Sequence, residues 1–444
     1  MSMKDEPSAA HEPRLVDDAL EAIQHDAFRY FLRETSPENG LVADNSRADS
    51  VASIAAVGFG LAAYAVGVER GFITRTEAVE RTLTTLRFFR GSVQGEQPDA
   101  TGHRGFYYHF LELKTGARTW QCELSMVDTA LLIAGALVAM TYFDGAGEGE
   151  KEIRDLAAFL YQRIDWRWAM NDRPIMSMGW KPGHGFIRYG WGGYSEAILL
   201  YVLGLGSPTH PLSPAGFAAW TLTYQWEDLY GCNFLFAAPL FVHQFSHAWI
   251  DFRGIQDAFM REKRSDYFEN SRRATYVQQH YAMRNPQRCN GYGENCWGIS
   301  AGDGPGWSRQ RVENAERDYW GYVARGVPYG PDDGTLAPWA VAASLPFAPE
   351  IVLPALRHMR DAYPGITKDD GALRSFNPTF SANDGTACGW VCPDLYGLEQ
   401  GPVVLMVENY RSGLLWRLMR RCKPVVAGLR QAGFRGGWLR RAGR

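Results

Sequence analysis

Apolar residues recur at helical spacing from the start of the chain. Leu20, Ile23, Phe28 and Phe31 place one apolar face along residues 15–34, which is the pattern of an amphipathic helix. The serine–proline and asparagine–glycine pairs that follow predict the end of this helix. The chain therefore begins its folded part with a helix that covers a core.

The helical pattern continues through most of the sequence. Residues 50–68 are apolar almost all round and predict a helix that is buried on every side. Thr74 and Glu77 have the spacing of a capping box, which predicts the start of a third helix. Further helices are expected over residues 123–142, 149–164, 194–205, 237–250, 254–262, 266–284, 349–362 and 402–420.

The segments between the predicted helices are long and rich in Gly, Trp, Tyr and Asp. They show no convincing ladder of alternating polar and apolar residues, although residues 103–113 are typical of a short hairpin. Roughly a dozen helices in pairs, with functional loops at one end, indicate an all-α toroid rather than a helix bundle. No linker or strong internal repeat divides the chain, which favours a single domain.

The two ends of the chain differ from this central region. Residues 1–14 are polar and lack the apolar core of a signal peptide, so a cytoplasmic location is expected; a start codon further upstream would place the protein in the periplasm. The longest apolar run, residues 130–140, is too short to cross a bilayer. Residues 421–444 are basic and are expected to form a solvated, partly disordered tail. The predicted domain therefore spans residues 15–420.

Composition narrows the class of function. A formal net charge of −3 over 444 residues gives no general attraction to nucleic acid or to an anionic membrane. Fifteen tryptophans, in an aromatic share of 13%, exceed what packing requires and favour a cleft lined with stacking platforms. Seven cysteines in a chain of this length do not resemble a disulfide framework, and their spacing gives no zinc-site pattern.

Carboxylates stand at the starts of several predicted helices. Glu123 and Asp128 open one apolar helix, Glu196 opens another after a glycine- and aromatic-rich stretch, and Glu399 precedes the helix at 402–420. Acidic residues in a first helical turn can simply complement the helix dipole. In a toroid, however, such helix starts can gather around one cleft, which is the arrangement that paired-carboxylate glycoside hydrolysis needs.

Three polar residues are expected on one helix face, because His243, His247 and Asp251 are spaced four residues apart. Such a trio could bind a metal ion, hydrogen-bond a sugar or form a buried network. The segment between the two histidines lacks the glutamate of metalloproteases, and a polar wall of the cleft is the favoured interpretation.

Two short motifs have better structural explanations than catalytic ones. Gly58-x-Gly60-x-x-Ala63 matches the dinucleotide fingerprint but lies inside an apolar helix with no strand before it, so helix packing explains it. Gly298-x-Ser300-x-Gly302 matches the nucleophile elbow of serine hydrolases but lies in a predicted loop. Neither a nucleotide site nor a serine hydrolase is therefore favoured.

Several segments resemble the glucoamylase-like bacterial proteins that include the endo-β-1,2-glucanases of glycoside hydrolase family 144. A related domain occurs in cyclic β-1,2-glucan synthases. The similar segments follow one another in the same order along residues 15–420. They are residues 123–135, 194–211, 239–254, 270–275, 332–338 and 401–413.

The resemblance implies an (α/α)6 barrel with long glycine- and aromatic-rich loops at its cleft end. It also implies a glycoside hydrolase that cleaves β-linked glucan, foremost β-1,2-glucan, with inversion and without a cofactor or metal. The expected partner is an oligo- or polysaccharide, and no nucleic acid or membrane span is expected. Transglycosylation on the same fold and a non-catalytic glucan-binding protein stay open as alternatives.

Carried over residue by residue, the acidic cleft residues of the family fall on Glu123, Asp128, Glu196 and Glu399. Glu196 is the first choice as general acid, with Asp128 or Glu399 as the base. Glu399 stands where the family pattern has Asp, and its extra methylene could alter the placement of the water. The other expected sugar contacts are aromatic or polar side chains of the same regions: Trp191, Tyr194, His243, His247, Trp249, Asp251, Arg253, Arg273, Trp297, Asp332 and Asp333.

Overall fold

The most apolar helices of the chain lie at its centre. The computed structural model describes residues 12–312, 315–381 and 387–440. Within these ranges six helices are buried along most of their length. Those over residues 54–69, 126–142 and 197–206 carry too few polar residues on any face to meet water. The six helices are α2 (Ile54–Glu69), α4 (Met126–Tyr142), α6 (Ala197–Gly206), α8 (Phe245–Trp249), α11 (Pro338–Ala343) and α13 (Gly397–Arg411).

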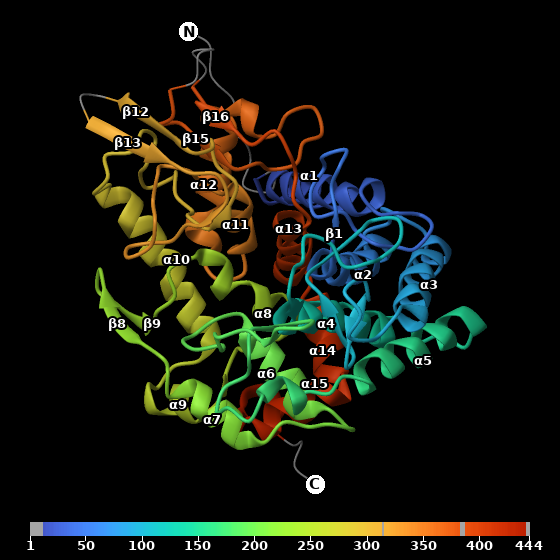
Figure 1. The fold of residues 1–444 in the computed structure, drawn as a ribbon. Helices are drawn as coiled ribbons and strands as arrows, with labels where there is room; N and C mark the ends of the chain where they lie inside the picture. The colour runs from blue at the N-terminus through green and yellow to red at the C-terminus, as the bar shows by residue number, and fades with distance from the viewer. Residues whose placement is uncertain (1–11, 313–314, 382–386, 441–444) are drawn as a thin grey trace.

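These six helices form a closed inner ring (Figure 1). Each packs against the next in chain order, from α2 to α4, α6 and α8, and from α11 to α13, and α13 returns to α2. The short α8 is tied to α11 by Gln244, whose side-chain amide donates to the carbonyl of Ala340 at 2.6 Å and to the hydroxyl of Ser344 at 2.8 Å. The first and last parts of the chain therefore meet where the ring closes.

Other helices surround this ring. Among them α1 packs on α2 and α13, α3 on α2 and α5, α5 on α4, and α12 on α11. Thr74 caps α3 by accepting from the amide of Glu77 at 3.2 Å, as its spacing predicts. This arrangement confirms the predicted (α/α)6 class. The surrounding helices are α1 (Glu12–Arg33), α3 (Arg75–Gly91), α5 (Glu148–Gln162), α7 (Pro214–Thr221), α9 (Ala258–Glu262), α10 (Tyr267–Arg284) and α12 (Pro349–Ala362).

Two glycines let α2 and α4 approach closely. A Cβ atom on Gly58 would lie 2.3 Å from the carbonyl oxygen of Leu131, and one on Gly135 would lie 2.0 Å from the carbonyl oxygen of Gly58. Only a residue without a side chain fits at this crossing. The glycine of the apparent dinucleotide motif therefore serves helix packing, as the sequence indicates.

Some predicted helices differ from the structure, and some helices of the structure were not predicted. The helix expected at 237–250 is a 3-10 turn, η2 (Leu240–His243), followed by the short α8. The helix expected at 402–420 starts five residues earlier as α13 and is broken at Gly413, after which α14 (Leu414–Arg421) begins. The sequence pattern also missed α7 and α11, which are only eight and six residues long.

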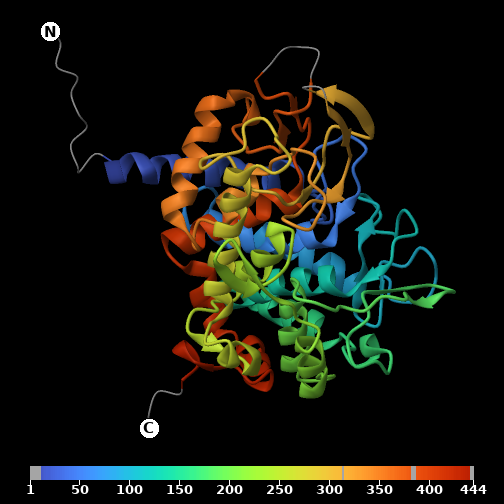
Figure 2. The ribbon, with the colours of Figure 1, turned by 90° about the vertical axis from the view of Figure 1, so that its left-hand side faces the viewer.

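Short strands occupy the long loops, and only the hairpin at 103–113 was expected among them. The largest sheet has the order β2-β3-β5-β6-β7, and the described strands otherwise pair two by two. Figure 2 shows the region of this sheet and the hairpin β12–β13 on the right-hand side of the barrel. The strands are β1 (Ala52–Ser53), β2 (Gly102–His103), β3 (Phe106–Tyr108), β4 (Phe110–Leu111), β5 (Leu124–Ser125), β6 (Gly179–Lys181), β7 (Gly185–Phe186), β8 (Trp226–Leu229), β9 (Cys232–Leu235), β10 (Ile255–Gln256), β11 (Ala301–Gly302), β12 (Ser308–Val312), β13 (Ala315–Tyr319), β14 (Val323–Ala324), β15 (Phe376–Asn377), β16 (Trp390–Val391) and β17 (Arg435–Gly436).

The basic C-terminal segment is folded up to Arg440, which corrects the expectation of a partly disordered tail. Helix α15 (Lys423–Gln431) packs on α6 and α14. Its Val425 and Leu429 are fully buried, and the indole of Trp438 donates to the carbonyl of Asp251 at 2.7 Å. The apolar residues of this segment outweigh its charge, because the arginines lie on the outer side of the same helices.

Candidate active site

A cavity of about 700 Å³ opens where the inner helices begin. Asp128 lies in the first turn of α4, Glu196 is the N-cap of α6, and Glu399 lies in the first turn of α13. Phe245 and Trp339, at the starts of α8 and α11, also line the cavity. The positive ends of these helix dipoles point at the cavity, which favours negative charge there.

The lining combines aromatic faces with carboxylates, which suits a sugar ligand. A volume of this size lies within the usual range for ligand pockets, roughly 300–1,000 Å³. Its aromatic residues are Phe110, Trp120, Trp191, Phe241, Phe245, Tyr322, Trp339 and Tyr396. Its charged and hydrogen-bonding residues are Asp44, Asn45, Arg47, His109, Glu123, Ser125, Asp128, Glu196, Asp303 and Glu399.

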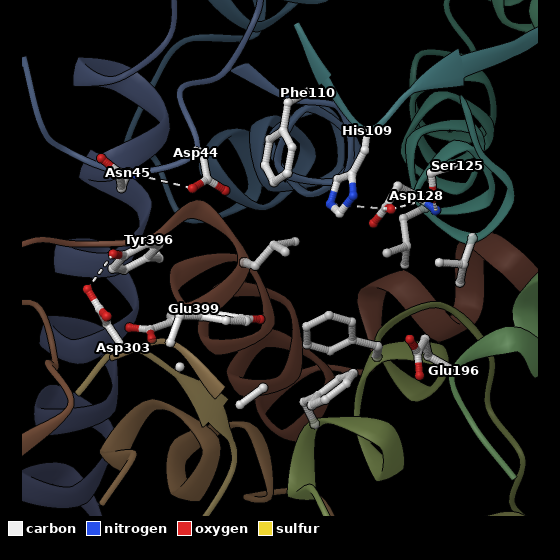
Figure 3. A pocket seen from close by; sticks show the side chains of 18 of the residues that line it. Asp44, Asn45, His109, Phe110, Ser125, Asp128, Glu196, Asp303, Tyr396 and Glu399 are labelled. Atoms are coloured by element: carbon white, nitrogen blue, oxygen red, sulfur yellow. Dashed lines mark hydrogen bonds and ion pairs between the residues drawn. The ribbon is translucent and has the colours of Figure 1, made fainter. Parts of the chain in front are cut away.

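One side of the cavity carries a histidine between two carboxylates, and Figure 3 shows His109 beside one of them, Asp128. His109 Nδ1 lies 2.9 Å from Glu123 Oε1, and its Nε2 lies 3.5 Å from Asp128 Oδ2. The ring stacks on Phe110 with centroids 4.0 Å apart. The hydroxyl of Ser125 donates to Asp128 Oδ2 at 2.5 Å. The carboxylate of Asp128 is therefore held in place by two groups.

The charges in this cluster stabilise one another. Burial opposes the charge on His109, but Asp128 and Glu123 outweigh it and raise the pKa of the imidazole to about 9. The hydrogen bond from His109 lowers the pKa of Glu123 to about 2. At neutral pH the histidine is a cation and Glu123 is ionised. Glu123 therefore orients His109 and stabilises its positive charge, and it does not supply a proton.

Glu196 lies in the opposite electrostatic environment. Burial, and then the nearby charge of Asp128, raises the pKa of its carboxyl to about 7. Its side chain is only partly exposed, toward the cavity. Its backbone is fixed by the hydroxyl of Ser246, which donates to the carbonyl of Glu196 at 2.8 Å. Near neutral pH this group can hold a proton and release it, which general acid catalysis requires.

A second group of carboxylates lies at the other end of the view in Figure 3. Burial raises the pKa of Glu399 to about 8, and the charges of Asp303 and Asp44 add to the effect. Glu399 is 4% exposed, and its Oε2 has no hydrogen-bond partner among the residues that the structure describes. Burial also raises the pKa of Asp44, which accepts a hydrogen bond from Asn45 at 3.1 Å. A buried oxygen without a partner in a cavity is suited to a hydroxyl of a ligand.

The two groups of carboxylates face a common space. Asp44, Asp128, Glu196 and Glu399 all line the same cavity, together with the exposed Tyr322. The four carboxylates predicted from the sequence, Glu123, Asp128, Glu196 and Glu399, are brought together, and Trp191 joins them.

The predicted trio His243, His247 and Asp251 lies outside the cavity, in buried networks. His243 contacts the carbonyl of Ala237, and His247 contacts the hydroxyl of Ser271 at 3.0 Å. Burial lowers the pKa of His243 to about 4 and that of His247 to about 3, so both stay neutral. The trio does not share a helix face, because α8 ends at Trp249. Its role as a sugar-binding wall is not supported.

Asp251 forms part of an ion-pair network at the end of α8. Its carboxylate accepts two hydrogen bonds at 2.8 Å from Arg253 and a further one from Arg420. Arg253 also stacks on Trp416, 4.3 Å from the ring centre. Arg253, predicted to bind sugar hydroxyls, is thus used within the fold.

The other predicted contacts also lie away from the cavity. Trp249 and Trp297 are fully buried, and Tyr194 packs against Tyr267 in the core. Arg273 donates to Glu269 at 2.9 Å and to the carbonyl of Asn233 at 2.7 Å. Aromatic residues in this chain fill the core as well as the cavity. The amino-acid composition therefore does not predict which of them line the cavity.

Asp332 and Asp333 stabilise the loop that follows α10 instead of lining the cavity. Asp332 accepts from the hydroxyls of Tyr281 at 2.9 Å and Tyr292 at 2.7 Å. Asp333 pairs with the buried Arg325, with Nε 2.8 Å from Oδ1. Their aspartate-rich turn is therefore a structural feature in this protein.

The cavity residues that were not predicted include five with charged or hydrogen-bonding side chains: Asp44, Arg47, His109, Asp303 and Tyr396. None of them opens a predicted helix, and helix starts were the signal used. His109 lies in the predicted hairpin at 103–113, and the others lie in loops whose positions depend on the tertiary fold. Residues 106–108 before His109 are all buried, so no alternation of buried and exposed positions marked His109 as a cavity residue.

The described ranges contain no group of three or more His, Cys, Asp or Glu side chains arranged to hold a metal ion. None of the helices in those ranges combines the length and hydropathy needed to span a lipid bilayer.

Comparisons with known proteins place the chain among helical barrels of one kind. The chain is 29% identical to the exo β-1,2-glucooligosaccharide sophorohydrolase (non-reducing end) of Parabacteroides distasonis, over 96% of this chain and 59% of that protein. It thus spans little more than half of the relative's length. The endo-β-1,2-glucanase of Chitinophaga pinensis, solved with sophorotriose and glucose, is similar with a TM-score of 0.83 and 25% identity, over 96% of this chain and 99% of the other.

The sequence profile of the Glycoamylase family, described as "Putative glucoamylase", matches residues 188–423, more than half of the chain. A structure from Bacteroides uniformis with the same description aligns with a TM-score of 0.84 and 28% identity, over 98% of this chain and 100% of the other. The matched region includes the general-acid candidate Glu196 and the inner helices from α6 to α13. The chain therefore belongs to the Glycoamylase family.

Proposed function

We propose that this protein is a glycoside hydrolase that cleaves β-1,2-glucan with inversion at the anomeric carbon. The observation that carries the proposal is the convergence of carboxylates with different proton affinities in one aromatic-lined cavity. Such a divergence of pKa values is how an enzyme assigns acid and base roles to similar side chains. The likeness to two proteins named for action on β-1,2-glucans supports the linkage.

Glu196 is proposed as the general acid. Its pKa of about 7 lets it carry a proton at neutral pH and pass it to the glycosidic oxygen as the bond to the anomeric carbon breaks. Carboxylates that line the cavity would stabilise the developing positive charge on the sugar ring. Trp191 also lines the cavity and is suited to stack on a sugar face.

Asp128 is proposed as the general base. A base must be ionised in the free enzyme, and a pKa of about 8 leaves Glu399 protonated near neutral pH. Asp128 instead contacts the cationic His109 and accepts from Ser125. It would take a proton from the water that attacks the anomeric carbon, while Glu399 and Asp44 accept hydrogen bonds from sugar hydroxyls.

The test is direct. The purified protein is incubated with linear β-1,2-glucan, and product size and anomeric configuration are followed by chromatography and proton NMR. We expect short β-1,2-glucooligosaccharides whose new reducing ends are first released as the α-anomer. Intact polymer would contradict the proposed substrate, and first release of the β-anomer would contradict inversion. Larger products formed by transfer would support the transglycosylase alternative.

The roles of the carboxylates are separated by variants. Glu196→Gln should lose about 10²–10⁴-fold in kcat/KM on glucan, and much less on an aryl β-sophoroside whose leaving group needs no proton. Asp128→Asn should regain activity with azide, giving an α-glycosyl azide, because azide attacks without a base. Azide rescue of Glu399→Gln instead would assign the base to Glu399.

A further inference from the structure

A tight turn at residues 119–122, between β4 and β5, lies at the edge of the cavity. The amide of Cys122 donates to the carbonyl of Thr119 at 3.1 Å, and the two residues between them, Trp120 and Gln121, have φ angles of 52° and 50°. Two consecutive positive φ angles are typical of a type I′ turn, which strongly favours Asn and Gly. A tryptophan followed by a glutamine is therefore an unusual sequence for this turn, and it costs conformational energy.

The neighbouring strand β4 holds the turn in this conformation. The amide of Thr119 donates to the carbonyl of Phe110 at 3.2 Å, and the thiol of Cys122 donates to the same carbonyl at 3.3 Å. The guanidinium of Arg118 donates to the carbonyl of Cys122 at 2.6 Å. Because Cys122 is itself buried, these contacts anchor the turn in the core. The position of the Trp120 backbone is therefore fixed before any ligand binds.

The indole of Trp120 is exposed although the turn that carries it is anchored. Trp120 is 64% exposed and lines the cavity. Its ring contacts that of Phe110, with centroids 5.1 Å apart, and Phe110 stacks in turn on His109 at 4.0 Å. His109 lies 3.5 Å from the buried Asp128, so this aromatic series leads from the carboxylates outward to solvent. Neither core packing nor turn preference explains an exposed indole in such a conformation.

We propose that Trp120 is a platform for a glucose unit of the substrate that lies beyond the two units joined by the cleaved bond. The inference rests on the proposed function. The apolar face of a β-linked glucose ring can stack on an indole, which gains free energy as water leaves both surfaces. Trp120 lies outside residues 188–423, which match the family profile, so that match does not assign it this role. The platform makes the enzyme prefer chains that are long enough to reach it.

A series of β-1,2-glucooligosaccharides that grows by one glucose at a time measures what each unit contributes. The value of kcat/KM is determined at every length for the wild type, Trp120→Gly and Trp120→Phe. Glycine removes the ring and adopts a positive φ without strain, so this variant tests the ring and not the turn. We expect the wild-type kcat/KM to rise about tenfold at the length that reaches Trp120. Trp120→Gly should lose this rise, and its deficit should begin at that length. Trp120→Phe should keep most of the rise, because it retains an aromatic face.

Trp307→Ala is the matched control. Trp307 is also an exposed tryptophan, at 79%, but the described residues that line the cavity do not include it. This variant should have the same kcat/KM as the wild type at every length. Melting temperatures within a few degrees of the wild type show that each variant is folded.

The outcomes separate the two proposals. A wild type that cuts none of these oligosaccharides overturns the proposed function. A wild type that cuts them with a length dependence that Trp120→Gly does not change overturns the inference and leaves the proposed function standing. An equal loss at all lengths in Trp120→Gly means that the ring shapes the cavity instead of binding a sugar, and it also overturns the inference. The same selective loss in Trp307→Ala does so too.

Discussion

Glu123 and Glu196 are both glutamates on the same cavity, and their surroundings give them opposite proton affinities. Glu123 accepts a hydrogen bond from His109 and has a pKa of about 2, while Glu196 is buried near Asp128 and has a pKa of about 7. Each pKa unit corresponds to about 1.4 kcal/mol between the protonated and ionised forms. The difference in environment is therefore large enough to assign different chemical roles to the two side chains.

The pKa of Glu196 predicts the alkaline side of the pH–activity profile. A general acid must be protonated, so kcat/KM on glucan should fall about tenfold per pH unit above about pH 7. With an aryl sophoroside that needs no proton, this decline should disappear in Glu196→Gln. The measurement is kcat/KM from pH 5 to 9 for both proteins. A decline that persists in Glu196→Gln with the aryl substrate would show that another group titrates.

Glu399 predicts how stability depends on pH. Burial raises its pKa from 4.5 to about 8, so the folded state binds more protons than the unfolded state between these values. The free energy of unfolding should fall as pH rises through this window, by a few kcal/mol at most. Glu399→Gln cannot ionise, so its melting temperature should match that of the wild type at pH 5 and exceed it at pH 9.

Glu123→Gln should change the pH dependence of stability in the opposite direction to Glu399→Gln. The lowered pKa of Glu123 stabilises the fold above pH 4.5, and this contribution is lost as the pH falls toward 2. Glu123→Gln should therefore be less stable than the wild type at pH 7. Equal melting curves for Glu399→Gln and the wild type at pH 9 would contradict the buried, raised pKa of Glu399.

At the residue scale, the sequence predicted the carboxylates of the site better than its other contacts. Glu123, Asp128, Glu196 and Glu399 were found because they stand at helix starts, and a barrel brings its helix starts together. His109 could not be found in this way, since its importance depends on two carboxylates that approach it only in the fold.

At the scale of elements, the crossing of α2 and α4 controls the position of the site. Gly58 and Gly135 bring the two backbones into contact, and α4 carries Asp128 in its first turn. A wider crossing would move Asp128 relative to the other inner helices. The packing of two buried helices is thus coupled to the geometry of the cavity.

Gly58→Ala should therefore destabilise the protein. The new methyl group would lie 2.3 Å from the carbonyl oxygen of Leu131, and such overpacking costs about 1–3 kcal/mol. Gly91→Ala is the control, because nothing lies within 4 Å of the added atom. Denaturant unfolding followed by circular dichroism measures both. An unchanged midpoint for Gly58→Ala would show that the crossing relaxes without cost.

The helix boundaries predicted from the apolar pattern agree with the structure for long helices and disagree with it for short ones. The expected helices at 15–34 and 123–142 agree with α1 and α4 to within about three residues. The short α8 and α11 gave too few turns for a helical period to stand out. The hairpin β12–β13 was missed because its exposed, charged strands carry no apolar alternation.

At the scale of the whole molecule, the barrel is completed by the last helices of the chain. The basic composition of residues 421–444 suggested a solvated tail, but α15 covers α6 and part of the core lies between them. The many charged residues of this segment indicate only which side chains face water. A minority of apolar residues at helical spacing is enough to fold it against the core. The (α/α)6 class itself was predictable, since it depends on the paired helices and not on any one boundary.

Leu429→Ala tests this closure. Leu429 is fully buried in α15, so its truncation should cost about 2–5 kcal/mol. Leu222→Ala is the matched control, because Leu222 is 87% exposed and its loss should stay within about 0.5 kcal/mol. Melting temperature and the denaturant midpoint measure both changes. Equal stability of the two variants would show that α15 is not part of the cooperative fold.

The pairing of the loop at Asn45 with the loop at Tyr396 has a consequence for how the protein is made. Residues from both early and late parts of the chain line the cavity. The site therefore cannot form until the ribosome has synthesised Glu399. Contacts between residues so far apart in sequence form slowly, because a long loop must close first. A chain that ends before α13 thus lacks both Glu399 and the helix that closes the inner ring, so the cavity cannot be complete.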